Sequence, residues 1–169
     1  MKYDLVIFDL DGTLMDTSKS ITKTVNSAME ELGKKQYSAN ECVKFVGGGV
    51  SGLARNILGK EKYEDVTNEE MEKVIRKYYD IYFDYGVEPY EGIPELLDFL
   101  EQNGVKKGIV TNKDHETALS AVDKKLSKWK FDGIFGSNEK EYPNKPNPYN
   151  VDKMAQNLNI SKEKILFVG

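Results

Sequence analysis

A continuous apolar run, Leu5-Val6-Ile7-Phe8, lies near the start of the sequence. Four adjacent apolar residues of this kind are typical of a strand that is buried on both faces, as in a parallel sheet. We therefore predict a strand over residues 4–10 that ends at the turn-forming string Asp11-Gly12-Thr13. Such a strand needs partner strands and covering helices elsewhere in the chain.

Strand and helix patterns alternate in the second half of the sequence. Strand-like segments cover residues 107–111, 134–136 and 165–168, and helical patterns separate them. This alternation is typical of a parallel α/β sheet. We predict an α/β fold with a parallel, Rossmann-like sheet, built from residues 1–16 and 87–169.

A helical block interrupts the alternation after the first strand. Two capping-box patterns start helices there, one at Ser38 with Glu41 and one at Thr67 with Glu70. Apolar residues recur at helical spacing through the block, and no strand pattern interrupts them. We therefore predict an inserted helical cap domain over residues 17–86.

The composition excludes several classes of function. The 169 residues contain 24 Lys and Arg against 28 Asp and Glu, which gives a net charge of −4. Such a surface offers no electrostatic reason to bind nucleic acid or anionic lipid. No apolar run reaches the roughly 18 residues that a membrane-spanning helix needs. We expect a cytoplasmic protein, either a monomer or a homodimer, without nucleic-acid or membrane partners.

The chain holds one cysteine, Cys42, and one histidine, His115. A zinc site of the His/Cys type needs more ligands than these two. We expect Cys42 to be a helix residue in a reducing compartment. We expect His115 to be a solvent-exposed residue in the first turn of a helix.

The predicted first strand ends in a pair of carboxylates, Asp9 and Asp11. Side chains at positions i and i+2 of an extended segment point to the same side. Because ligands of open parallel sheets bind beyond the carboxyl ends of the strands, this pair faces the expected ligand site. Such a pair can hold Mg²⁺, attack phosphorus or shuttle a proton. The D-x-D pattern alone is often only a turn.

The longer string Asp9-Leu10-Asp11-Gly12-Thr13-Leu14 is more specific. Directly after an N-terminal apolar strand, it resembles the haloacid dehalogenase-like superfamily, and the placement of the cap resembles its phosphoglycolate phosphatase-like branch. The resemblance implies that Asp9 is the nucleophile and Asp11 the general acid and base. It also implies a Mg²⁺ site formed by Asp9 and the backbone carbonyl of Asp11.

Two further strings match the same superfamily in the same order. The resemblance implies that Thr111 and Asn112, at the end of a strand, hold the transferring phosphoryl group. It also implies that Lys145, in a K-P-N-P string, supplies positive charge to it, and we expect Lys113 to approach the phosphate. The alternatives are an ordinary strand end and a solvated lysine in a proline-rich turn.

The cap contains a Gly47-Gly48-Gly49 string between two expected helices. We expect a turn there that faces the active site, with Gly48 close to the substrate. Arg55 is a candidate contact for a substrate carboxylate. The alternatives are a plain interhelix turn and a surface arginine.

The sequence departs from the superfamily pattern after its fourth strand. The resemblance implies an acidic motif that follows this strand and completes the Mg²⁺ site, whereas the sequence stops at Gly169. We therefore expect a C-terminally truncated chain with weak Mg²⁺ affinity. We also expect the strand over 165–168 to be an uncovered apolar edge.

These features predict a Mg²⁺-dependent phosphatase that acts on a small phosphorylated metabolite of the phosphoglycolate type. The reaction would pass through an aspartyl-phosphate on Asp9. Two alternatives stay open. One is a phosphosugar mutase of the same superfamily, and the other is an inactive fragment that retains ligand binding.

Overall fold

The computed structural model describes residues 2–138 and 141–169. The chain divides into two compact units, one from Thr17–Val87 and the other from the residues on either side of it. Thr17–Val87 are called the cap unit below, and the residues on either side of them are called the sheet unit. Within the described residues, no helix combines the length and apolar character that a membrane span requires.

The sheet unit is built around four parallel strands in the order β5-β4-β1-β6. Their bounds are Gly133–Ser137 for β5, Lys106–Asp114 for β4, Leu5–Phe8 for β1 and Ile165–Val168 for β6. The predicted α/β fold with a parallel sheet is confirmed. Strand β1 pairs with β4 from Leu5 opposite Lys106 and with β6 from Leu5 opposite Ile165. The first strand of the chain is therefore central, and β6 lies at the edge of the sheet.

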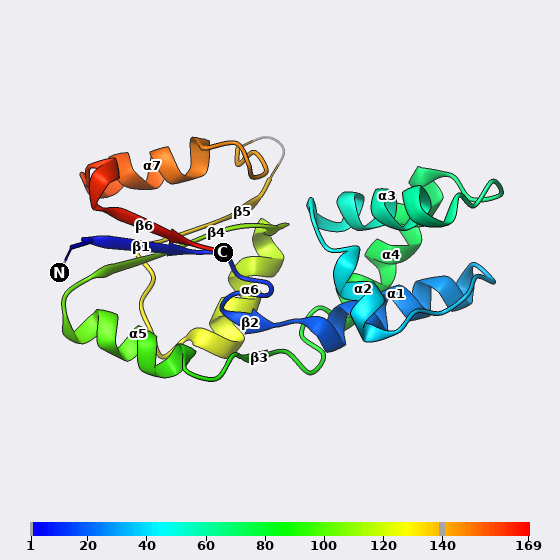
Figure 1. Ribbon diagram of the computed structural model, residues 1–169, viewed down its shortest axis with the longest axis horizontal. Helices are drawn as coiled ribbons and strands as arrows, with labels where there is room; N and C mark the ends of the chain where they lie inside the picture. Colours follow the sequence, from blue (N-terminus) through cyan, green and yellow to red (C-terminus); the bar gives the residue numbers. More distant parts are fainter. Residues whose placement is uncertain (1, 139–140) are drawn as a thin grey trace. The chain divides into compact units, whose positions relative to one another are not determined.

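Helices cover both faces of this sheet (Figure 1). Helix α7 (Tyr149–Leu158) lies on one face, and α5 (Ile93–Gln102) and α6 (His115–Leu126) lie on the other. On the α7 side, Leu5, Ile7, Val110, Phe135 and Met154 form a buried apolar cluster. The burial of all four β1 side chains explains why this strand has no polar position.

Strand β4 is longer than the sequence predicts. It runs to Asp114 rather than ending at Thr111, and its register with β5 shifts between Val110 and Asp114. The polar residues 111–113, which suggest a loop, therefore lie on an irregular extension of the strand. This extension carries the polar side chains beyond the carboxyl end of β1.

A second, very small sheet was not predicted. Strand β2 (Met15–Asp16) pairs antiparallel with β3 (Glu88–Pro89), where the chain leaves and re-enters the sheet unit. Two-residue strands have no periodicity that a sequence pattern can reveal. A 3₁₀ turn over Lys162–Lys164 precedes β6.

The cap unit consists of helices, as predicted. They are α1 (Ser18–Glu31), α2 (Ala39–Lys44), α3 (Gly49–Glu61) and α4 (Asn68–Tyr82). Both predicted capping boxes are confirmed: the Glu41 carboxylate accepts from the Ser38 N–H at 3.0 Å, and the Glu70 carboxylate accepts from the Thr67 N–H at 2.9 Å. Each box satisfies backbone groups that a helix start leaves unpaired.

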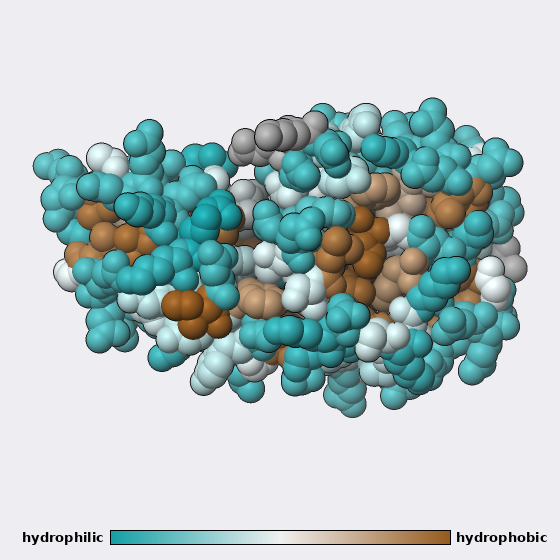
Figure 2. All heavy atoms as spheres, turned by 180° about the vertical axis from the view of Figure 1, so that it is seen from behind, coloured by the Kyte–Doolittle hydropathy of each residue, from teal (hydrophilic) through white to brown (hydrophobic). Residues whose placement is uncertain are grey.

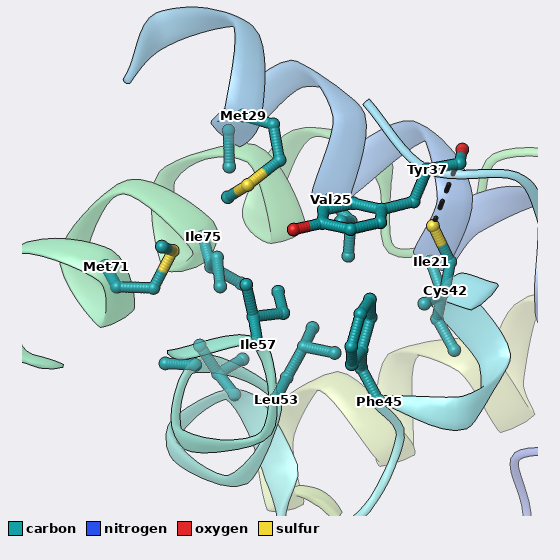
Figure 3. Close-up of a cluster of buried hydrophobic side chains, with 13 residues drawn as sticks. Ile21, Val25, Met29, Tyr37, Cys42, Phe45, Leu53, Ile57, Met71 and Ile75 are labelled. Atoms are coloured by element: carbon teal, nitrogen blue, oxygen red, sulfur yellow. Dashed lines mark hydrogen bonds between the residues drawn. The ribbon is translucent and has the colours of Figure 1, made fainter. Parts of the chain in front are cut away.

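The cap unit has its own hydrophobic core (Figure 3). Fully buried side chains from α1, α3 and α4, among them Val25, Ile57 and Met71, meet in its centre. The rings of Tyr37 and Phe45 pack edge to face at 5.1 Å. Cys42 is a buried helix residue in this core, as expected.

One glycine sets how α3 begins. A Cβ at Gly52 would overlap the carbonyl oxygen of Gly47. The backbone of the Gly47-Gly48-Gly49 turn therefore lies directly against the first turn of α3. This turn joins α2 to α3, as predicted.

Exposed apolar side chains remain on the sheet unit. On β6, Leu166 and Phe167 are exposed. In Figure 2, hydrophobic residues (brown) lie between hydrophilic residues (teal) on the surface of both units.

Candidate active site

The two aspartates lie at the carboxyl end of β1. The Asp9 N–H donates to the carbonyl of Val168 at 2.9 Å, which continues the pairing between β1 and β6 by one residue. Its carboxylate Oδ1 accepts from the Leu10 N–H at 2.7 Å. The chain turns at Gly12, whose φ of 78° is a left-handed conformation that glycine adopts readily. Asp9 and Asp11 therefore sit on a fixed turn at the end of a buried strand.

Each aspartate is paired with a lysine. The Lys145 Nζ lies 2.8 Å from Asp9 Oδ2, and the Lys113 Nζ lies 3.1 Å from Asp11 Oδ1. Both carboxylates remain partly accessible, with 26% and 19% of their side chains exposed. The pairs thus bring two positive and two negative groups to one edge of the sheet, within reach of a ligand.

Lys113 contacts Asp11 in the structure. Only 3% of its side chain is exposed, and its ammonium group pairs with Asp11. An approach of Lys113 to the phosphate stays a prediction. Its partnership with Asp11 went unpredicted because it depends on the extended, irregular end of β4.

Thr111 lies on the strand next to β1 and is almost fully buried. Its Oγ1 accepts from the Lys113 N–H at 3.2 Å. This bond fixes the backbone of the strand end that also carries Asn112 and Lys113. A role for the Thr111 hydroxyl in holding a phosphoryl group stays a prediction.

The Asn112 side chain is engaged by Lys145. Its Oδ1 accepts from the Lys145 N–H at 2.6 Å, and its Nδ2 donates to the Lys145 carbonyl at 3.2 Å. The family resemblance predicts that Asn112 holds a phosphoryl group. In the structure its acceptor and one N–H are occupied by the backbone of another candidate residue.

His115 is not the solvent-exposed residue that the sequence predicts. It starts α6, but it is half-buried, and its Nδ1 accepts from the Gly136 N–H at 3.2 Å. Its ring also packs against Tyr142 at 4.9 Å. A Cβ at Gly136 would lie 2.6 Å from the Cα of His115, so strand β5 passes directly against this helix start. The prediction that His115 is solvent-exposed was wrong, because Gly136 of β5 and Tyr142 pack against its side chain.

The two substrate-binding candidates of the cap unit lie close to each other. Gly48 is the N-cap of α3 with a φ of 72°, and Arg55 is exposed on the same helix. A Cβ at Gly48 would lie 3.6 Å from the Arg55 Nη2. Nearby on α3, the Ser51 hydroxyl donates to Glu72 at 2.6 Å, which lowers the pKa of that carboxyl. Contact of Gly48 and Arg55 with a substrate stays a prediction.

The donor set at the sheet edge suits a hard cation. Asp9 and Asp11 offer partly accessible carboxylate oxygens, and Mg²⁺ is usually bound through one or two carboxylates together with waters and substrate phosphates. A Cβ at Gly169 would lie 2.8 Å from the Cβ of Asp9, so the chain after β6 passes beside this carboxylate. Among residues 2–138 and 141–169, no cluster of three or more His, Cys, Asp or Glu side chains is positioned to hold a metal. Binding of Mg²⁺ by Asp9 and the backbone carbonyl of Asp11 stays a prediction.

Comparison with known proteins identifies the family. The haloacid dehalogenase-like hydrolase family matches residues 6–169, which is nearly the whole chain. This chain belongs to the haloacid dehalogenase-like hydrolase family. The resemblance noted from the D-L-D-G-T-L string is thereby confirmed.

Named relatives of this haloacid dehalogenase-like chain include two kinds of phosphatase. A phosphoglycolate phosphatase from Aquifex aeolicus is 35% identical over 168 residues, covering 98% of this chain and 75% of the relative. A pyrophosphatase, PpaX, from Halalkalibacterium halodurans is 31% identical over 169 residues, covering 100% of this chain and 75% of the relative.

A solved structure agrees with the fold. The haloacid dehalogenase-like hydrolase from Streptococcus pneumoniae superimposes with a TM-score of 0.84 at 26% identity, covering 99% of this chain and 76% of that one. Over the length of this chain, the haloacid dehalogenase-like fold is therefore present in both units.

Proposed function

We propose that this chain is a Mg²⁺-dependent phosphatase that hydrolyses a small phosphorylated metabolite through an aspartyl-phosphate on Asp9. The observation that carries the proposal is the pair of accessible aspartates at the end of β1, each with its own lysine. The relatives named phosphoglycolate phosphatase and pyrophosphatase support the same reaction type.

The first step transfers the phosphoryl group to the protein. A carboxylate oxygen of Asp9 attacks phosphorus, and the bond between phosphorus and the leaving oxygen breaks. Asp11, in its protonated form, gives its proton to that oxygen, and general acid catalysis of this kind typically contributes about 10²–10⁴ in rate. The substrate is released as the alcohol, and Asp9 holds the phosphoryl group as an acyl phosphate.

The second step regenerates the carboxylate. Asp11, now ionised, accepts a proton from a water molecule as that water attacks the phosphorus atom of the acyl phosphate. The bond between phosphorus and the Asp9 oxygen breaks, and inorganic phosphate leaves. Asp11 is then protonated again, and Asp9 is again a carboxylate.

Positive charge is needed because a carboxylate approaches a phosphate dianion. Two like charges about 4 Å apart repel by about 4 kcal/mol at an effective dielectric constant of about 20, and a dianion doubles this. Lys145, 2.8 Å from Asp9, offsets part of this repulsion. Asp9 and the backbone carbonyl of Asp11 would hold Mg²⁺, which when bound neutralises phosphate charge and orients the phosphoryl group. Thr111 would donate to an oxygen of the transferring group.

The relatives suggest two substrates, phosphoglycolate and pyrophosphate. We propose phosphoglycolate as the first to examine, because the relative named for it has the higher identity of the two. Arg55 would contact its carboxylate. We also propose a cytoplasmic location.

The test measures phosphate release from phosphoglycolate, pyrophosphate and p-nitrophenyl phosphate, with Mg²⁺ and after its removal by EDTA. Asp9→Asn should abolish release, since an amide cannot form the acyl phosphate. Asp4→Asn is a matched control, because Asp4 lies at the opposite end of the same strand. Release that survives Asp9→Asn unchanged would contradict the proposal. Isomer formation without phosphate release would favour the phosphosugar mutase.

A further inference from the structure

The starting observation is the two-way hydrogen bonding between Asn112 and the backbone of Lys145. The two residues are 33 positions apart in sequence. The Asn112 amide both accepts from the Lys145 N–H, at 2.6 Å, and donates to its carbonyl, at 3.2 Å. A side-chain amide used in this way presents to Lys145 the same donor and acceptor that a neighbouring strand would present.

Residues 143–148, which include Lys145, lie outside the helices and strands. Lys145 lies between β5 and α7, just after Asn144, whose carbonyl accepts from the Asn147 N–H at 3.1 Å. Loop segments of this kind are more mobile than the elements that they connect. Asn112, by contrast, lies on the extension of β4, which is held by the bond from the Lys113 N–H to Thr111 Oγ1 and by the pairing of Asp114 with Ser137 of β5. The paired bonds thus tie a loop residue to a rigid element.

The hydrogen bonds between Asn112 and the Lys145 backbone help to determine where the Lys145 ammonium group lies relative to Asp9. The Lys145 side chain reaches Asp9 Oδ2 at 2.8 Å, while 22% of that lysine side chain stays exposed. A lysine side chain is a flexible four-carbon stem with considerable rotamer freedom. If its backbone moved as well, the ammonium group would seldom be at the reacting oxygen, and a misplacement of about 1 Å can cost about 10²-fold in rate.

We propose that Asn112 is a positioning residue, which acts on the reaction by fixing the backbone of Lys145 rather than by holding the phosphoryl group. This inference rests on the proposed function, because it assigns Lys145 to the transition state at Asp9. It changes the role that the sequence suggests for Asn112. The second N–H of the Asn112 amide is the group through which a direct phosphate contact would act, so the two roles need to be separated by experiment.

The first experiment does not depend on activity. Hydrogen exchange of the Lys145 amide is followed by NMR in the wild type, in Asn112→Ala and in Asn103→Ala. Asn103 is a matched control, because its side chain also donates to a backbone carbonyl in the same unit, at 2.8 Å, but on α5. We expect exchange of the Lys145 amide to accelerate about tenfold in Asn112→Ala alone. Unchanged exchange would overturn the proposal, whether or not the chain is active.

A second variant covers the case in which Asn112→Ala fails to fold. Asn112→Asp keeps the acceptor for the Lys145 N–H and removes the donor to its carbonyl. We expect the Lys145 amide to stay protected in this variant. If the Lys145 amide exchanged rapidly in a folded Asn112→Asp variant, the proposal would be overturned, because the acceptor for the Lys145 N–H is still present in that variant.

The second experiment separates positioning from phosphate contact by a double-mutant cycle with Lys145→Ala. If Asn112 acts through Lys145, Asn112→Ala should lower kcat by about 10–100-fold in the wild type and have almost no further effect in Lys145→Ala. Equal effects in both backgrounds would show that Asn112 acts independently of Lys145 and would overturn the proposal. A wild type without turnover would contradict the proposed function, and the exchange experiment would then decide this inference alone.

Discussion

At the scale of single residues, the two lysine–aspartate pairs differ in how deeply they are buried. The Lys113 side chain is almost entirely removed from water, whereas the Lys145 side chain remains partly accessible. Removing one partner of a buried pair leaves the other charge poorly compensated, which costs more than losing a surface pair. Lys113 is therefore expected to matter for stability as well as for the charge around Asp11.

Lys113→Met tests this expectation. Methionine keeps most of the side-chain volume and removes the charge, so we expect the free energy of unfolding to fall by about 2–4 kcal/mol, because Asp11 loses a partner and is only partly hydrated. Lys128→Met is the control, since Lys128 pairs with Asp98 at the surface, and should cost less than about 1 kcal/mol. Urea unfolding of both variants measures the difference. An equal loss of unfolding free energy in the two variants would show that burial does not make the Lys113–Asp11 pair more stabilising than a surface pair.

The residues at the site differ in how far the sequence could predict them. Asp9 and Asp11 follow a strand whose apolar run is unambiguous, so their place at its carboxyl end could be predicted. The pairing of Lys113 with Asp11 could not, because it depends on the register shift in β4. The burial of His115 depends likewise on a contact with Gly136, 21 residues away.

At the scale of elements, the backbone of the Gly47-Gly48-Gly49 turn depends on a glycine in the following helix. Because a Cβ at Gly52 would overlap the Gly47 carbonyl oxygen, no other residue fits there without moving the turn. Gly59, on the same helix, has open space around its Cα. The two glycines thus form a matched pair that separates packing from helix propensity.

Gly52→Ala should destabilise the chain by about 1–3 kcal/mol, as expected for overpacking against backbone that cannot yield easily. Gly59→Ala should stabilise it by about 0.5–1 kcal/mol, because alanine favours the helix. Thermal unfolding of the two variants measures both effects. Similar shifts of the same sign would contradict the close approach of the turn to α3.

Elements with a pattern of their own were predictable, and elements without one were not. The capping boxes at Ser38 and Thr67 mark helix starts because each side-chain interaction is local. Strands β2 and β3 hold two residues each, and their pairing joins positions that lie on either side of the cap unit. Only the folded chain brings them together.

At the scale of the whole molecule, stability should depend on pH at both ends of the range. Hydrogen bonds from the backbone N–H groups of Ser38 and Thr67 lower the pKa of Glu41 and Glu70, and the Lys77 ammonium lowers that of Glu31. A carboxyl whose pKa is lower in the folded state stabilises the fold above its unfolded pKa, near 4.5, and this contribution is lost as the pH falls. Burial raises the pKa of the Cys42 thiol to about 11. Burial also raises the pKa of Tyr37, so both groups favour the fold below about pH 9 and lose that effect as the pH rises.

We therefore expect a plateau of the melting temperature between about pH 6 and pH 8, with declines below about pH 4.5 and above about pH 9. Circular dichroism melts from pH 3.5 to 10.5 would measure the profile. Glu70→Gln removes one titrating group and should make the acid decline shallower. An acid decline with the same slope in this variant would exclude a contribution from Glu70.

The central position of β1 has a consequence for synthesis. Strand β1, which precedes Asp9, is translated before both of its neighbours in the sheet, β4, about a hundred residues later, and β6, which begins at Ile165. The cap unit is contiguous, so its helices can close their core while the ribosome is still making the rest of the chain. Until β4 emerges, the apolar segment Leu5–Phe8 has no sheet to join, and in the cell it is the part of the nascent chain that a chaperone would need to shield.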